Sequence, residues 1–231
     1  MKPELIIALD VPTAKKIPQV VDQLPERVVW YKIGLELFTA DGPAAFTYLQ
    51  NCNKKIFLDL KLHDIPRTVE RAIASAARHQ VAMLTVHASG GRVMIRAAAE
   101  SARACGATAP RIIAVTTLTS LDAKDLMDIG ISRSLPEHTL ALGMAACEAG
   151  ADGLVCSPLE APEFQKRLGP KCILVTPGIR PAGSDTGDQK RIATPRAAVE
   201  AGAHYLVVGR PILDSKDPRA AAEEILNQMS G

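Results

Sequence analysis

The stretch Phe57-Leu58-Asp59-Leu60-Lys61-Leu62-His63-Asp64-Ile65-Pro66-Arg67-Thr68 sets charged residues into a hydrophobic run. Its alternation predicts a strand, with one face formed by Ile56, Leu58, Leu60 and Leu62 and the other by Phe57, Asp59, Lys61 and His63. A carboxylate and an ammonium group therefore share a face. Burying such a face is costly unless the charges are paired and used. We interpret this segment as the centre of a catalytic site at the mouth of a barrel.

Short β-rich runs alternate with Ala-rich helical patterns on both sides of this segment. Strands are expected at 5–10, 28–34, 55–62, 82–87, 111–118, 153–156, 172–176 and 205–209. Helices are expected near 14–24, 43–51, 67–79, 91–104, 136–149, 160–168, 195–201 and 218–229. Eight strand–helix units without a linker predict an α/β fold, a (β/α)8 TIM barrel that forms a single domain over residues 1–231.

A doubly wound sheet is the alternative fold. Such a sheet usually has fewer strands and often carries a glycine-rich turn after its first strand. The loop expected after the first strand here is Asp10-Val11-Pro12-Thr13, which is not a GxGxxG turn. The barrel is therefore the favoured architecture.

Composition excludes several classes of function. The formal net charge of +2 and the 3% aromatic content argue against a nucleic-acid-binding surface. No apolar stretch is long enough to span a bilayer, and the N-terminal apolar run ends at Asp10, which is unlike a signal peptide. The five cysteines form no CxxC pair and are expected to be reduced thiols in a cytoplasmic protein. No HxH, HExxH or comparable cluster predicts a metal site.

Charged residues recur near the carboxyl ends of the first three strands. Asp10 shares a face with Ile6 and Ala8, and Lys32 shares one with Trp30 and Gly34. Because the ends of barrel strands meet around one mouth, we expect Asp10, Lys32, Asp59 and Lys61 to form an array of alternating charge. Each residue alone is compatible with a solvated position at the rim of the barrel. Charged residues on the corresponding face of three adjacent strands favour a functional site over this alternative. For Asp64, spacing alone does not separate catalysis from helix capping.

The last two strands predict an anion site. In barrels the loops after strands 7 and 8 often bind phosphate. Gly209 permits close backbone approach and Arg210 offers a bidentate fork, while Gln189 lies on the long loop after strand 7. The alternative for Arg210 is a surface ion pair. We interpret His63 and His87, near strand ends, as packing or hydrogen-bonded residues rather than general bases.

At these positions the chain resembles the orotidine 5′-phosphate decarboxylase family in its compact bacterial form. The resemblance runs nearly end to end, through Ile7–Asp10, Tyr31–Gly34, the DxKxxDIxxT block Asp59–Thr68, Thr85–Gly91, Val115–Ser120, Thr176–Arg180 and Val208–Ile212. No functional position departs from the family pattern. The DxKxxDIxxT block is highly specific when it is joined to the KIG and GRPI segments.

The resemblance implies a decarboxylase that converts orotidine 5′-phosphate to UMP, the last step of de novo pyrimidine nucleotide synthesis, without metal or organic cofactor. The catalytic network it implies consists of Lys32, Asp59, Lys61 and Asp64, in which Lys61 stabilises the C6 carbanion and then protonates it. It also implies a homodimer, because Asp64, Ile65 and Thr68 would reach into the partner subunit's site.

The resemblance further assigns substrate contacts. Asp10 and Lys32 would hold ribose hydroxyls, and Thr119 would bond the pyrimidine edge. The 5′-phosphate would be bound by Gln189, Gly209 and Arg210, with Arg180 nearby on the same loop as Gln189. The expected partners are thus a small-molecule substrate, its product UMP and a second subunit, and neither nucleic acid nor a membrane.

Two other functions stay open from the sequence. One is a Mg²⁺-dependent sugar-phosphate decarboxylase or aldolase of the same superfamily, such as 3-keto-gulonate 6-phosphate decarboxylase or hexulose phosphate synthase. Those enzymes hold the metal partly with a Glu where this chain has Lys32, whose charge would repel it. The other is a non-catalytic nucleotide-binding barrel, which would not need the inward pair of Asp59 and Lys61.

Overall fold

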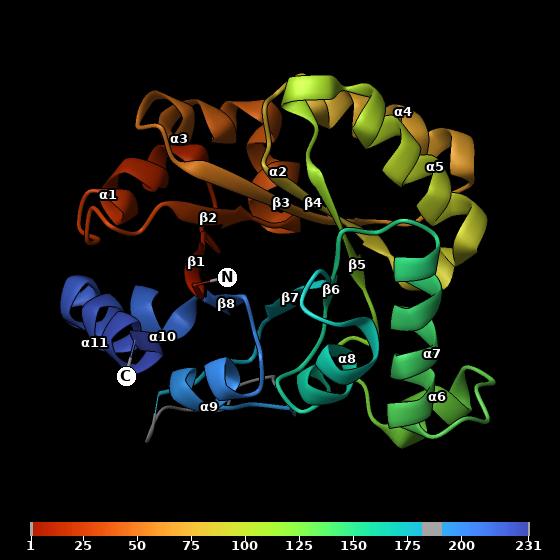
Figure 1. Cartoon of the computed structure of the whole chain (residues 1–231). Helices are drawn as coiled ribbons and strands as arrows, with labels where there is room; N and C mark the ends of the chain where they lie inside the picture. The colour runs from red at the N-terminus through yellow and green to blue at the C-terminus, as the bar shows by residue number, and fades with distance from the viewer. Residues whose placement is uncertain (1, 182–190, 231) are drawn as a thin grey trace.

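The computed structural model of the chain describes residues 2–181 and 191–230. Within these residues, eight parallel strands pair in chain order and close into a barrel, which the helices surround (Figure 1). The strands are β1 (Glu4–Ala8), β2 (Trp30–Ile33), β3 (Lys55–Leu62), β4 (Met83–His87), β5 (Arg111–Val115), β6 (Gly153–Val155), β7 (Ile173–Thr176) and β8 (Tyr205–Val208). The predicted (β/α)8 TIM barrel is confirmed.

The helices of the described residues follow the strands around the outside. The α-helices are α1 (Ile17–Val21), α2 (Leu35–Asp41), α3 (Thr47–Asn51), α4 (Pro66–Ala77), α5 (Gly91–Ala104), α6 (Ala123–Asp128), α7 (Leu135–Glu148), α8 (Ala161–Leu168), α9 (Pro195–Glu200), α10 (Arg210–Leu213) and α11 (Pro218–Ser230). Short 3₁₀ turns are η1 (Ala14–Lys16), η2 (Gly42–Phe46), η3 (Ala88–Gly90) and η4 (Gly106–Thr108). In the part of the chain described, none of these helices has both the length and the apolar character that crossing a membrane requires.

The differences from the expected elements have local causes. Sequence periodicity missed α2, α6 and α10, which are too short to display a full helical period. A capping box fixes the start of α6, because the Asp122 and Asp125 side chains each accept a backbone N–H of the other residue. Several expected strands extended too far at their carboxyl ends, since those last residues belong to the loops around the mouth. Only β3 has the bounds that alternation predicted.

Two apolar layers hold the fold together. The larger one lies between the strands and the surrounding helices, and the smaller one fills the barrel interior. The interior layer contains Ile6 and Ala8 of β1, Trp30 of β2 and Phe57 of β3. An even number of positions separates these residues from Lys32 on β2, Asp59 on β3 and Asp10, which lies two residues beyond the end of β1. The charged residues therefore continue the inward-facing side of each strand. Because the interior apolar residues pack inside the barrel, the charged residues that follow them on the same face point toward the mouth of the barrel.

The barrel contains a histidine whose titration should affect stability. His204, just before β8, is buried, and its Nδ1 accepts the backbone N–H of Leu174 at 3.0 Å. Burial lowers the pKa of His204 below its usual value. The unfolded chain therefore binds this proton more readily, so the free energy of unfolding should fall as the pH drops below about 6.5, the ordinary pKa of histidine.

Chemical denaturation between pH 7.5 and pH 5 measures this loss, with His204→Asn as the comparison. The Asn side chain supplies an oxygen acceptor in place of Nδ1 but does not titrate. We expect the variant to lose less stability on acidification than the parent protein. Equal losses in the two proteins would show that His204 does not contribute.

Candidate active site

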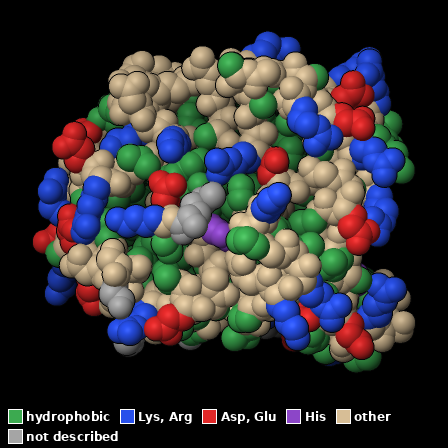
Figure 2. Space-filling model, viewed as in Figure 1, with side chains coloured by type: hydrophobic (Ala, Val, Ile, Leu, Met, Phe, Trp, Pro, Cys, Tyr) green, Lys and Arg blue, Asp and Glu red, His purple; other side chains and the backbone are tan. Residues whose placement is uncertain are grey.

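A cavity of about 310 Å³ opens at the carboxyl ends of the strands, a volume within the range of small-molecule sites. Its floor is apolar and includes Val115, Val155, Val175 and Val207, and its wall carries the charged residues of the first three strands. Lys and Arg side chains interspersed with acidic ones gather over the centre of the face in Figure 2. The site thus combines an apolar base with a charged wall.

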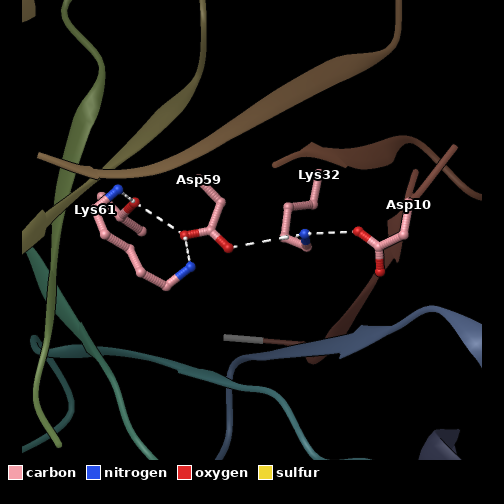
Figure 3. Close-up of polar contacts among 5 residues, drawn as sticks. Asp10, Lys32, Asp59 and Lys61 are labelled. Carbon is pink, nitrogen blue, oxygen red and sulfur yellow. Dashed lines mark hydrogen bonds and ion pairs between the residues drawn. The ribbon is translucent and has the colours of Figure 1, made fainter. Parts of the chain in front are cut away.

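The expected array of alternating charge is present. Lys61 Nζ lies 2.9 Å from Asp59 Oδ1, and Lys32 Nζ lies 3.8 Å from Asp59 Oδ2 and 3.1 Å from Asp10 Oδ1 (Figure 3). The side chains of Lys32 and Asp59 are each only 13% exposed, whereas that of Asp10 is 52% exposed. Each buried carboxylate oxygen therefore faces a cation, which offsets much of the cost of desolvation.

A backbone irregularity aims the Lys61 side chain. The β3–β4 register shifts between Leu58 and Leu62, and Lys61 has a φ of +49°. At this bulge the Lys61 N–H donates to Thr85 Oγ1 at 2.8 Å, and the Thr85 hydroxyl donates to Asp59 Oδ1 at 3.0 Å. A non-glycine residue in the left-handed region is strained, and such strain gathers at functional sites. Thr85, fully buried on β4, is a site residue that sequence reasoning missed.

Two glycines leave room for this array. A Cβ added to Gly34 would lie 2.9 Å from Lys32 Nζ, and one added to Gly209 would lie 3.1 Å from Asp10 Oδ2. Any larger residue would displace the charged groups. The need for Gly209 was predicted for phosphate, but the role of Gly34 in accommodating Lys32 was not. Only the close approach seen in three dimensions indicates it.

The predicted substrate-binding residues fall into three groups. Asp10, Thr119, Arg180, Gly209 and Arg210 line the cavity together with Lys32, Asp59 and Lys61. Asp64, Ile65 and Thr68 are exposed and do not line it, and Asp64 Oδ1 accepts the Ile65 N–H at 2.6 Å. Gln189 lies outside the described residues. One subunit therefore brings together the array and the arginines but not the Asp64 segment.

The two histidines near the mouth pack against each other. The rings of His63 and His87 stack with centroids 5.3 Å apart, and His87 Nδ1 lies 2.7 Å from Ser89 Oγ. Burial and the neighbouring His63 and Lys61 lower the pKa of His87. Neither histidine is among the described residues that line the cavity, which agrees with their interpretation as packing residues.

A parallel barrel with paired charges and arginines at its mouth defines a (β/α)8-barrel enzyme for a small anionic substrate. Comparison with known proteins gives the family. The sequence model of the orotidine 5′-phosphate decarboxylase / HUMPS family matches residues 3–225. The chain therefore belongs to this family.

Individual relatives cover nearly the whole chain. The orotidine 5′-phosphate decarboxylase of Moorella thermoacetica is 48% identical over 97% of this chain and 91% of its own length. The orotidine 5′-phosphate decarboxylase of Nostoc sp. is 44% identical over 98% of this chain and 97% of its own length. The crystal structure of the orotidine 5′-phosphate decarboxylase from Lactobacillus acidophilus superposes with a TM-score of 0.89 at 36% identity, covering 99% of this chain and all of the other.

Proposed function

We propose that the protein is a carboxy-lyase that removes CO₂ from C6 of orotidine 5′-phosphate and forms UMP in pyrimidine nucleotide synthesis. The observation that carries the proposal is the array of Asp10, Lys32, Asp59 and Lys61 in a barrel of this family. We place the reaction in the cytoplasm, in keeping with five cysteines that are all free thiols.

The chemistry requires a fixed positive charge at C6. Loss of CO₂ leaves a lone pair at C6 that the pyrimidine ring cannot delocalise well. The Lys61 ammonium, held 2.9 Å from Asp59, would stabilise this developing anion and then transfer its proton to C6. Preorganised charge in a water-poor site is usually the largest catalytic contribution. The strained Lys61 backbone fits this role, because it fixes the side chain before substrate arrives.

Asp59 would act on both the lysine and the substrate. Its Oδ1 accepts from Lys61 and Thr85 together, which orients the ammonium group. A substrate carboxylate placed beside Asp59 would be repelled by roughly 4 kcal/mol at ~4 Å and an effective dielectric of ~20. That repulsion disappears as neutral CO₂ forms. Asp59 would therefore favour the transition state over the bound substrate.

The remaining cavity residues would bind the rest of the nucleotide. Asp10 and Lys32 would contact the ribose hydroxyls, and Thr119 the pyrimidine edge. Arg180, Gly209 and Arg210 line the cavity after β7 and β8, where barrels commonly bind phosphate. With Gln189 they would hold the 5′-phosphate. Binding energy gained there, away from C6, would contribute to reaching the transition state.

We propose that the active enzyme is a homodimer with shared sites and uses no metal or organic cofactor. Asp64, Ile65 and Thr68 would complete the partner subunit's site, which accounts for their position outside their own cavity. Large apolar side chains at the N-terminal ends of α2, α4 and α5, which follow β2, β3 and β4, support this arrangement. Leu35, Ile65 and Val93 are 56%, 67% and 70% exposed. Exposed apolar groups on one rim are typical of an interface.

A metal-dependent sugar-phosphate enzyme is the competing function. Lys32 Nζ lies between the Asp10 and Asp59 carboxylates, at 3.1 and 3.8 Å. A divalent cation placed between these carboxylates would be repelled by the ammonium group. This contact supports the metal-free reaction.

One assay tests the proposed function. Orotidine 5′-phosphate is added to EDTA-treated protein, and loss of its ultraviolet absorbance is followed together with UMP formation. We expect full turnover, unchanged when Mg²⁺ is added back. Turnover that requires Mg²⁺ would favour the sugar-phosphate branch, and tight UMP binding without turnover would favour a nucleotide-binding barrel.

A further inference from the structure

A buried ion pair lies behind the cavity wall, among residues that the proposed mechanism does not use. Arg191, after β7, and Glu160, at the start of α8, pair through Nη1 and Oε1, with side chains only 9% and 11% exposed. Replacement of a buried ion pair by apolar residues is often neutral or stabilising. Stability is therefore a weak reason for this pair, and its other contacts indicate what it does.

Arg191 also holds the loop after β5. Its Nη2 donates to the backbone carbonyls of Thr117 at 3.1 Å and Leu118 at 2.8 Å. Both residues line the cavity and directly precede Thr119, the residue assigned to the pyrimidine edge. One guanidinium group thus fixes two successive peptide units of the cavity wall. Hydrogen bonds from a charged donor are the stronger kind.

Glu160 ties the pair to the loop after β6. Its Oε2 accepts the Ser157 backbone N–H at 2.7 Å, while Oε1 faces Arg191. Both carboxylate oxygens are therefore engaged, and the guanidinium cannot move without breaking one of these contacts. The pair connects the loops that follow β5 and β6.

The backbone near Arg191 extends this connection to the loop after β7. The Arg180 N–H donates to Ala193 O at 2.9 Å, and the Ala193 N–H donates to Gly178 O at 3.2 Å. Gly178 and Arg180 line the cavity on the side where phosphate is expected. Arg191 thus lies two residues from a backbone bridge that anchors the phosphate side, while its side chain holds the pyrimidine side.

We propose that the Arg191–Glu160 ion pair is a positioning device that fixes the spacing between two walls of the cavity. The pyrimidine-side wall is Thr117–Thr119 and the phosphate-side wall is Gly178–Arg180. This inference rests on the proposed function, because it assumes a nucleotide that touches both walls at once. Without the pair, each wall still binds its own part of the ligand, but the two no longer fit one molecule.

Competitive inhibitors that probe the walls separately and together test the proposal. The test variant is Arg191→Lys, which keeps the charge beside Glu160 but replaces the planar fork with a compact ammonium group that cannot span Glu160 and both carbonyls in the same geometry. We expect the inhibition constant of UMP to rise about 10²-fold, by analogy with the loss of catalytic rate that a misplacement of roughly 1 Å can cause. The constants of uridine and ribose 5-phosphate, which each probe one wall, should stay near the parent values.

Two further variants make the result decisive. Glu160→Gln keeps an acceptor for the Ser157 N–H but removes the ion pair. It should raise the inhibition constant of UMP and leave those of uridine and ribose 5-phosphate unchanged, so it tests the proposal even if Arg191→Lys folds poorly. Arg196→Lys changes an exposed arginine that pairs with Glu200 at 2.9 Å on α9, and should leave all three inhibition constants unchanged. An unchanged UMP constant in Arg191→Lys and Glu160→Gln, or equal proportional losses for all three inhibitors, overturns the proposal. Absence of UMP binding to the parent protein would instead overturn the proposed function.

Discussion

Replacing Lys61 with alanine should abolish UMP formation while nucleotide binding survives. The variant loses both the charge that stabilises the C6 anion and the proton donor. Each such contribution is worth on the order of 10²- to 10⁴-fold, so a loss of at least about 10⁴-fold is expected. Nucleotide binding should survive because Asp10, Thr119 and Arg210 line other parts of the cavity and would still contact the nucleotide. Absorbance assays measure turnover, and titration with UMP measures binding.

Lys55→Ala provides the matched control for this result. Lys55 begins the same strand at the opposite end of the barrel, where its Nζ lies 5.0 Å from the centre of the Trp30 ring. Its replacement removes the same charge from β3 without touching the cavity, and turnover should persist. Near-normal UMP formation by Lys61→Ala would exclude Lys61 from the chemistry, whatever the control shows.

Much of the barrel was predictable because its signals are local. Short β-rich runs identified every strand of the barrel. The alternation of side chains along a strand predicted that Asp10, Lys32 and Asp59 share one face with their inward neighbours and meet at one mouth. The same rule set Lys61 beside Asp59. The alternation of side chains could not predict the φ of +49° at Lys61, because a β-bulge does not change the hydrophobic pattern of the sequence.

The supporting residues of the site were harder to find, for a different reason. Thr85 looked like an ordinary strand threonine, and its hydroxyl matters only because the bulge on β3 brings the Lys61 N–H to it. Arg191 and Glu160 come from different loops, 31 positions apart, and join only when the barrel closes. Periodicity reports which face a residue takes, but it does not report which loops meet.

Mixing two inactive variants should restore activity if sites are shared between subunits. Lys61→Ala lacks the acid in its own cavity, and Asp64→Ala lacks the group it would lend to its partner. Random exchange makes about half of the dimers hybrid, and one of the two sites in each hybrid has both residues, so about a quarter of the parent activity should return. The unmixed variants should stay inactive.

The geometry of Asp64 makes this mixing test specific. Its side chain is exposed, its Oδ1 accepts the Ile65 N–H, and it does not line the cavity of its own subunit. Lys61→Ala mixed with the double variant Lys61→Ala/Asp64→Ala should recover nothing, because no hybrid site then has a Lys61. Exchange itself is followed with two affinity tags. If tagged subunits exchange while activity stays absent from the first mixture, Asp64 does not act across the interface and the shared-site arrangement is wrong.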